Sequence, residues 1–328
     1  MHRSRLVVSL VLAVLIALGL GIALAELQEG APGEGGADVP KKFEIGLIGD
    51  IPYDAEQQRR TEVLFGRMEA EELAFVVHVG DIKSGDSPCT DEILLHEKGR
   101  FENFAHPLVY VPGDNEWTDC HRTGYDPIER LRRLREIFFV GDESLGEKTI
   151  PLVRQSADYP ENVRWSYGDV TFLGLNVPGS NNNLGRTSEA DAEYAARNEA
   201  DLGWIRESFD RAEADGSSAV MIIMQANPGF ELAPEMRTGY EDLLAALEQE
   251  TVAFGKPVVL AHGDTHTFRV DKPMIASPTG ERVENFTRVE TFGSPEVNWV
   301  RAMVDASDPE VFSFRPEVVD EKTVEGRR

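Results

Sequence analysis

Short apolar runs along this chain end in side chains of types that can bind cations. The runs end at Asp50, Asp81, Asp114, Asn227 and Asp264, and each of the four aspartates follows a glycine. One Gly-Asp after a strand is weak evidence, because Asp readily forms turns there. Four carboxylates brought together would have to take up protons or bind cations, since like charges at short range repel. The pattern therefore predicts a metal site.

The elements that must position these residues alternate between strands and helices. Each run is rich in β-branched residues, and an amphipathic helix is expected over residues 126–139, with Asp126 as its cap and Pro127 in its first turn. Further helices are expected over residues 187–216 and 240–255. In such sheets ligands bind beyond the carboxyl ends of the strands.

Two strand pairs complete the expected fold. Residues 164–177 read as a hairpin that turns at Gly168-Asp169, and residues 297–305 and 311–319 read as a second pair. Strand-helix alternation followed by hairpins predicts α/β or α+β layers around packed mixed sheets in one domain.

Composition excludes one class of partner. The 328 residues carry 33 Lys and Arg against 58 Asp and Glu, a formal charge of −25. So acidic a chain is not expected to bind a nucleic-acid backbone, and a solvated acidic surface is the simplest interpretation.

The N-terminal 25 residues resemble an export signal. A basic start is followed by an apolar run over residues 6–25, which ends in the small-x-small pattern Ala23-Leu24-Ala25. We expect a signal peptide or an uncleaved membrane anchor over 1–25, a linker over 26–42 and a polar tail over 320–328. Both alternatives place the protein outside the cytoplasm, in the periplasm or the extracellular space, and any membrane association would be through residues 6–25 alone.

Export bears on the two cysteines. In an oxidising compartment an even number of cysteines favours a disulfide, here Cys89–Cys120, over a metal thiolate pair or a nucleophile. The bond would tie the loop after Asp81 to the loop after Asp114 and stabilise the fold by roughly 3–4 kcal/mol.

From residue 43 to 319 the chain resembles the calcineurin-like metallophosphoesterases. The matching blocks occur in the family's order: GDIPY at Asp50, HVGDIKSG at Asp81, VPGDNEW at Asp114, MQANP at Gln225, and AHGDTHTF at Asp264 and His266. The resemblance implies a four-layer αββα sandwich, in which two mixed β-sheets are flanked by helices, and a site for two divalent cations.

The chain departs from the family at several histidines. Pro52 replaces the first, Asn115 replaces the one thought to protonate the leaving group, MQANP has none, and Asp264 replaces the first of the last block. Asp114 stands in place of a ligand Asn. The implied ligands, with Asp81 bridging both cations, are Asp50, Asp81, Asp114, Asp264 and His266. Such oxygen-rich ligation favours Mn²⁺, Mg²⁺, Ca²⁺ or iron over Zn²⁺.

The remaining candidate roles concern proton transfer and substrate charge. Asn115 occupies the family's acid position, and His121 and His262 are imidazoles whose ordinary pKa suits a general acid. Lys83, Arg122 and Asn227 are candidates for contacts with the substrate. Lys83, and Arg122 or His121, could neutralise its charge, and the alternative for these three side chains is that they are simply solvent-exposed.

We therefore expect an exported, metal-dependent hydrolase of phosphomonoesters or phosphodiesters that acts on a small phosphorylated substrate through a metal-activated water. The absence of a Gly-x-Ser-x-Gly motif disfavours a serine hydrolase. The alternative is a non-catalytic scaffold that binds a cation, a ligand or a protein at the cell envelope. The missing histidines favour the scaffold, whereas their replacement by ligating or hydrogen-bonding residues favours the enzyme.

Overall fold

The computed structural model describes residues 40–277 and 279–319. The predicted signal or anchor, most of the predicted linker and the predicted tail lie outside the described residues. Within the described ranges, no helix is both long and apolar enough to span a membrane.

The described chain contains two mixed β-sheets. The five-stranded sheet has the order β12-β11-β1-β2-β3. Its strands are β1 (Lys42–Ile48), β2 (Phe75–His78), β3 (Leu108–Tyr110), β11 (Trp299–Asp305) and β12 (Phe312–Glu317). The three strands β1, β2 and β3 run parallel, with Leu47 paired to Val77 and Val77 to Val109.

The seven-stranded sheet has the order β4-β5-β6-β7-β8-β10-β9. Its strands are β4 (Val153–Arg154), β5 (Val163–Tyr167), β6 (Val170–Gly174), β7 (Ala219–Ile223), β8 (Val258–His262), β9 (Arg269–Asp271) and β10 (Phe286–Glu290). Strands β6, β7, β8 and β10 are parallel to one another. The hairpin predicted at Gly168-Asp169 is confirmed as β5–β6, because both turn residues adopt the positive φ that a tight hairpin turn requires.

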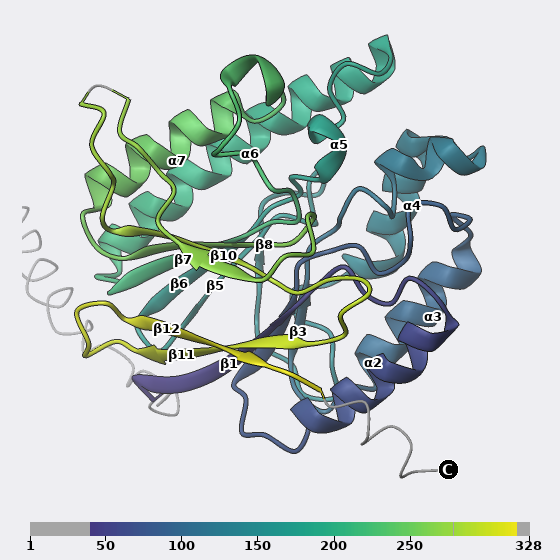
Figure 1. The fold of residues 1–328 in the computed structure, drawn as a ribbon, viewed down its shortest axis with the longest axis horizontal. Helices are drawn as coiled ribbons and strands as arrows, with labels where there is room; N and C mark the ends of the chain where they lie inside the picture. Colours follow the sequence, from purple (N-terminus) through teal and green to yellow (C-terminus); the bar gives the residue numbers. More distant parts are fainter. Residues whose placement is uncertain (1–39, 278, 320–328) are drawn as a thin grey trace, which may run out of the picture. The chain divides into compact units, whose positions relative to one another are not determined.

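Helices cover the outer face of each sheet (Figure 1). On one side lie α2 (Ala55–Met68), α3 (Asp91–Glu102) and α4 (Pro127–Phe138), and on the other lie α6 (Ser188–Ala214) and α7 (Glu241–Phe254). The predicted cap of α4 is confirmed, since the Asp126 carboxylate accepts hydrogen bonds from the amides of Ile128 and Glu129.

Three apolar cores separate these layers. Alternate residues of both sheets, such as Leu47, Val77 and Met221, pack between the sheets. The opposite face of the five-stranded sheet packs on α2, α3 and α4, and that of the seven-stranded sheet packs on α6 and α7. The predicted αββα sandwich is therefore confirmed, with its parallel strands carrying the candidate blocks.

Candidate functional site

The two sheets bring the predicted blocks together at the carboxyl ends of their parallel strands. Asp264 follows β8, and its amide donates a hydrogen bond of 3.0 Å to Oδ1 of Asp50, which follows β1. Gln225 follows β7, and its Nε2 lies 3.1 Å from Oδ2 of Asp81, which follows β2. Residues from both sheets thus share one cluster, as the sequence predicts.

The backbone of this cluster is unusual. Asp50, Asp81, Asp264 and His266 have φ values of 55°, 59°, 78° and 59°. Positive φ in residues other than glycine costs on the order of 1 kcal/mol or more per residue and persists only where surrounding contacts impose it. Four of the five predicted ligands therefore sit in strained conformations, which is typical of functional sites.

Asp81 is surrounded by hydrogen-bond donors. Its Oδ1 accepts from the amide of Asn115 at 3.1 Å, and its Oδ2 accepts from Nδ2 of Asn115 at 2.9 Å and from the hydroxyl of Tyr53 at 3.0 Å. Gln225 contributes the fourth bond and is itself oriented, because its Oε1 accepts from the amide of Gly179. The carboxylate is consequently fixed in one orientation.

His266 is arranged like a metal-binding histidine. Its Nδ1 lies 2.7 Å from the carbonyl oxygen of Ser294, which can only accept a hydrogen bond. Nε2 lies 3.5 Å from Oδ1 of Asp50 and 3.3 Å from the hydroxyl of Tyr53. A ring whose Nδ1–H is tied to a carbonyl presents Nε2 as the ligand atom, the arrangement usual in metalloproteins.

Asp114 and Asp264 lie on either side of Gly179. A Cβ atom added to Gly179 would lie 2.7 Å from Oδ2 of Asp114 and 2.8 Å from Oδ1 of Asp264. Any larger residue would therefore fill the space between the two carboxylates. The backbone amide of Asn227 donates to the other oxygen of Asp264 at 2.9 Å, so Asn227 also lies at the cluster.

Burial disfavours ionisation of these carboxyl groups. It raises the pKa of Asp50, and burial together with the charges of Asp114 and Glu116 raises the pKa of Asp81 well above its usual value. Burial and the neighbouring charges of Asp264 and Asp119 raise the pKa of Asp114 to about 8. Burial, opposed by the amide of Asn227, raises the pKa of Asp264 to about 6. A bound cation would offset the free-energy cost of ionising these buried carboxyl groups.

The donor chemistry of the cluster fits a hard divalent cation. Most of the predicted ligand atoms are carboxylate oxygens, and the imidazole of His266 is held through Nδ1, which leaves Nε2 to bind metal. Within residues 40–277 and 279–319, however, no three Asp, Glu, His or Cys side chains are grouped closely enough to hold a metal ion. The neutral donors of Tyr53, Asn115 and Gln225 point at Asp81 in this arrangement. Cation binding would thus require some of these side chains to turn away.

Substitution of Gly113 tests how tightly the site is packed. A Cβ at this position would lie 2.0 Å from Oδ1 of Asp81, so Gly113→Ala must displace that carboxylate. We expect a loss of about 1–3 kcal/mol in the free energy of unfolding, measured by urea denaturation. Gly99→Ala, in α3 with open space around it, is the control and should be neutral or stabilising. Equal effects of the two substitutions would contradict this packing.

The two basic residues predicted to contact the substrate, Arg122 and Lys83, differ in their surroundings. Arg122 lies near the cluster: its side chain is half exposed and pairs with Asp119 at 2.7 Å. Lys83 is buried, and its Nζ donates to the carbonyls of Ser84 and Ser87, so the charge is turned toward its own loop. Burial lowers the pKa of Lys83.

Neither imidazole proposed as an acid forms a hydrogen bond with a predicted ligand among the described residues. His121 is exposed, with Nδ1 2.7 Å from the carbonyl of Thr118. His262 is fully buried, and burial lowers its pKa to about 4. Among the described residues its Nε2 has no hydrogen-bond partner. Strand alternation explains this placement, because His262 shares a face of β8 with Leu260, which packs in the core beneath α6 and α7.

The predicted disulfide Cys89–Cys120 is present and joins the loops that follow β2 and β3. Glu116 joins the same loops, because its carboxylate accepts from the amides of Ile82 and Gly113. Asp81 and Asp114 are therefore held at a fixed separation by one covalent and one hydrogen-bonded link.

Sequence reasoning did not assign roles to Tyr53, Asp119 and Ser180, which all contact the cluster. By their sequence, residues 179–190 fit a substrate-facing loop or a surface insertion equally well. The run Ser180-Asn181-Asn182-Asn183 was the available indication, since Asn tolerates positive φ better than most residues.

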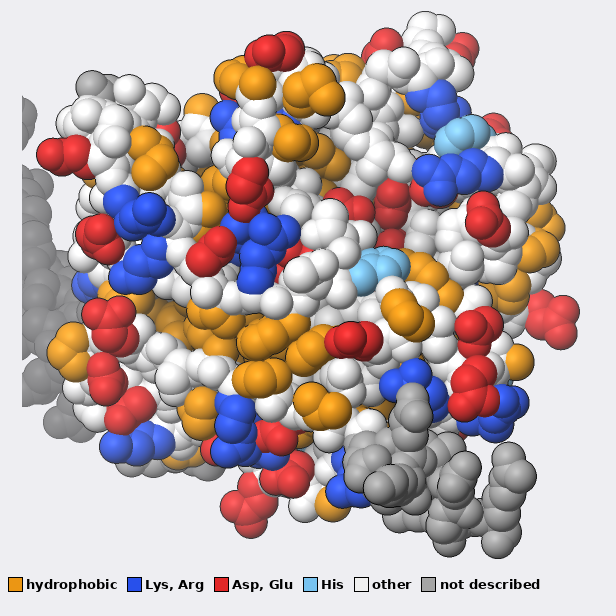
Figure 2. Space-filling model, viewed as in Figure 1, with side chains coloured by type: hydrophobic (Ala, Val, Ile, Leu, Met, Phe, Trp, Pro, Cys, Tyr) orange, Lys and Arg blue, Asp and Glu red, His pale blue; other side chains and the backbone are white. Residues whose placement is uncertain are grey.

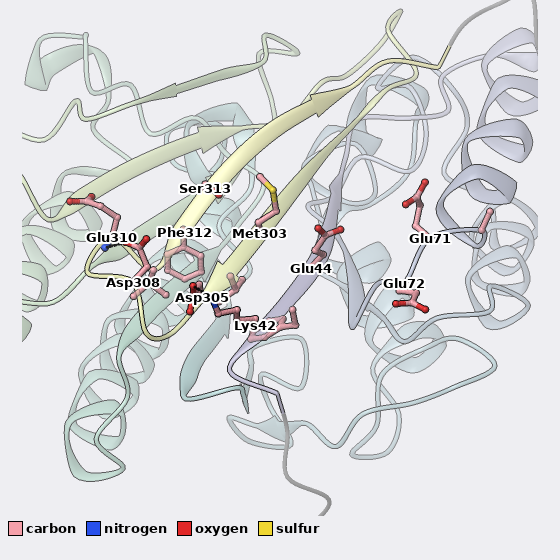
Figure 3. A pocket seen from close by; sticks show the side chains of 14 residues that line it. Lys42, Glu44, Glu71, Glu72, Met303, Asp305, Asp308, Glu310, Phe312 and Ser313 are labelled. Atoms are coloured by element: carbon pink, nitrogen blue, oxygen red, sulfur yellow. Dashed lines mark hydrogen bonds and ion pairs between the residues drawn. The ribbon is translucent and has the colours of Figure 1, made fainter.

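A large cavity in the described residues lies elsewhere. It has a volume of about 920 Å³ and is lined by residues that include Glu44 of β1, Met303 and Asp305 of β11 and Phe312 of β12 (Figure 3). None of the predicted site residues lines it. Figure 2 shows one face of the molecule. On this face, Asp and Glu side chains lie between a histidine and a group of Lys and Arg side chains.

Comparison with known proteins gives similarity in structure alone. No protein-family model matches the chain, and no curated protein matches its sequence. A dimetal phosphatase from Danio rerio is similar in structure, with a TM-score of 0.52, 14% identity, and coverage of 84% of this chain and 96% of that one. The structure of PhoD matches with a TM-score of 0.51 and 12% identity; the match covers 83% of this chain and 65% of that one. Both likenesses concern the arrangement of the two sheets and their helices, and on that arrangement the chain has the calcineurin-like metallophosphoesterase fold.

Proposed function

We propose that the protein is a metal-dependent phosphoesterase that hydrolyses small phosphomonoesters or phosphodiesters. The observation that carries this proposal is that four strand-end aspartates and His266 lie at the same ends of the parallel strands, linked through direct contacts and through Gln225 and Gly179, in a fold shared with a dimetal phosphatase. Buried carboxyl groups in strained backbone, whose pKa values are raised mainly by burial, are a costly arrangement. Binding of divalent cations would offset that cost.

The residues that would hold two cations are Asp50, Asp81, Asp114, Asp264 and His266. Their mainly oxygen donors suit Mn²⁺, Mg²⁺, Ca²⁺ or iron better than Zn²⁺. Such cations, when bound, lower the pKa of a water molecule and stabilise charge on a phosphoryl group.

The chain's own side chains would bind and orient the substrate. Burial raises the pKa of Tyr53 well above its ordinary value, so the hydroxyl keeps its proton at neutral pH. Nδ2 of Asn115 lies 2.9 Å from the hydroxyl oxygen of Tyr53, and both groups can donate hydrogen bonds to phosphoryl oxygens. Arg122, half exposed beside Asp119, can offset the substrate's negative charge.

A second candidate function is a non-catalytic scaffold that binds a cation, a ligand or a protein partner. The observation in its favour is the hydrogen-bonded state of Asp81, whose acceptor sites are filled by the chain's own donors. We also propose that the protein acts outside the cytoplasm. The disulfide between Cys89 and Cys120 supports this, because such bonds persist mainly in oxidising compartments.

The test is hydrolysis after metal exchange. The protein, purified with its disulfide intact, is stripped of metal and reloaded separately with Mn²⁺, Mg²⁺, Ca²⁺ or Zn²⁺. Release of product from a chromogenic phosphomonoester and phosphodiester is then followed. We expect turnover that depends on the metal and is greatest with an oxygen-preferring cation. Folded protein that binds a cation yet hydrolyses neither ester would favour the scaffold instead.

A further inference from the structure

The segment after β6 forms a left-handed turn beside the cluster. Ser180, Asn181, Asn182 and Asn183 have φ values of 50°, 53°, 57° and 67°. Left-handed residues normally occur singly, because the Cβ atom crowds the following carbonyl oxygen. Four in succession require strong external contacts.

Those contacts come from buried residues of α6 and of the segment before α7. The fully buried guanidinium of Arg197 donates to Oδ1 of Asn182 at 2.7 Å and to its carbonyl oxygen at 3.0 Å. The hydroxyl of Tyr240 accepts from the Asn182 amide at 3.1 Å. Gly239 donates its amide to Oδ1 of Asn181 at 2.9 Å. The turn is therefore built rigidly into the fold.

What this rigid turn presents to the cluster is one hydroxyl group. Oγ of Ser180 lies 2.8 Å from Oδ2 of Asp114 and 2.7 Å from Oδ1 of Asp119. Ser180 is exposed, whereas both carboxylates are buried. Because Asp119 also pairs with Arg122, the contacts run in an unbroken series from Arg122 through Asp119 and Ser180 to Asp114.

We propose that Ser180 is a positioning residue of the catalytic site, which holds the Asp114 carboxylate in its ligating orientation and links it to the substrate-facing Arg122. This inference rests on the proposed function and extends it to a residue outside the motif blocks. A carboxylate ligand must be held within about 0.5 Å of its working position, and hydrogen bonds from outside the ligand set provide this precision.

The decisive variant is Ser180→Gly. Glycine accepts positive φ without strain, so the turn should keep its shape and thermal stability while the hydroxyl is lost. We expect about tenfold weaker Mn²⁺ binding by calorimetry, and a kcat about tenfold lower at saturating metal with the ester KM changed less than twofold.

Asn183→Gly is the matched control. It makes the same replacement in the same turn, but the Asn183 side chain contacts Glu193 and Arg186 and not the aspartates. We expect its Mn²⁺ affinity and kcat to equal those of the unmodified protein. A merely structural turn would make the two variants behave alike.

The outcomes separate this inference from the proposed function. Mn²⁺ affinity that is equal in all three proteins would overturn the role of Ser180, even if the unmodified protein hydrolyses esters. Weaker Mn²⁺ binding in Ser180→Gly alone would support that role, even if no ester is hydrolysed, a result that would overturn only the hydrolase. Absence of Mn²⁺ binding by the unmodified protein would overturn both.

Discussion

Asp81→Asn is expected to lower kcat for phosphoester hydrolysis at least ~10³-fold, because the substitution removes the charge from the carboxylate that the other site residues surround. Asp81 lies at the centre of the cluster, in contact with Tyr53, Asn115 and Gln225. It is also among the residues proposed to hold the cations. The measurement is initial rate against metal concentration, with near-UV circular dichroism to verify the fold.

Asp86→Asn is the control for this substitution. Asp86 lies in the same loop after β2 but is exposed, and its amide donates to the hydroxyl of Ser84. The control should hydrolyse esters at the rate of the unmodified protein. Activity retained by Asp81→Asn would place the chemistry away from this cluster.

The metal-free protein is expected to lose stability as the pH rises above 6.5. The folded state keeps a proton on Asp114 up to a pKa of about 8, whereas an unfolded Asp has lost it near 4. The folded state therefore binds more protons, and the free energy of unfolding falls with pH. Between pH 6.5 and 8, Asp114 alone contributes a loss of about 2 kcal/mol, and Asp81 acts in the same direction.

Below pH 6.5 two buried histidines act in the opposite sense. Burial lowers the pKa of His78 to about 3 and that of His262 to about 4, so both must be neutral in the folded protein. The stability that they contribute is lost as the pH falls through this range, while the carboxyl of Asp264, with a pKa of about 6, favours folding there. The falling limb above pH 6.5 is therefore the clearer test of the carboxylate cluster.

Urea unfolding in EDTA at pH 6.5 and pH 8 measures this slope. Asp114→Asn, which cannot titrate, should flatten it by about 2 kcal/mol. Saturating Mn²⁺ should stabilise the protein more at pH 8 than at pH 6.5, because ligands bind metal in their deprotonated form. A stability that rises with pH in EDTA would show that the pKa values of these carboxyl groups are not raised in the folded protein.

The positive φ values offer a structural reason why the site is costly to fold. Eight of the ten non-glycine residues with positive φ among the described residues belong either to the predicted ligands or to the turn at Ser180–Asn183. Contacts such as that of Arg197 with Asn182 offset this strain. Backbone strain that lowers stability but fixes the geometry of side chains is typical of sites that bind ligands or catalyse reactions.

The sequence by itself predicted the layered fold, the disulfide and the strand ends that carry the aspartates, because these follow from local patterns, from their order along the chain and from the cysteine count. Apolar runs, turn residues and cysteine number are read directly along the chain. The contact of Asp264 with Asp50 follows from the expected meeting of strand ends, and it is present.

Only the tertiary structure decided which side chains face the cluster. His262 and Asp264 are two residues apart, yet the first faces the core beneath α6 and α7, and the second turns into the site. Ser180 reaches Asp114 across 66 positions of sequence, because Arg197 and Tyr240 hold its turn in place. The direction of a side chain depends on strand register and on contacts between segments that are distant in sequence. Neither can be read from the residues immediately around that side chain.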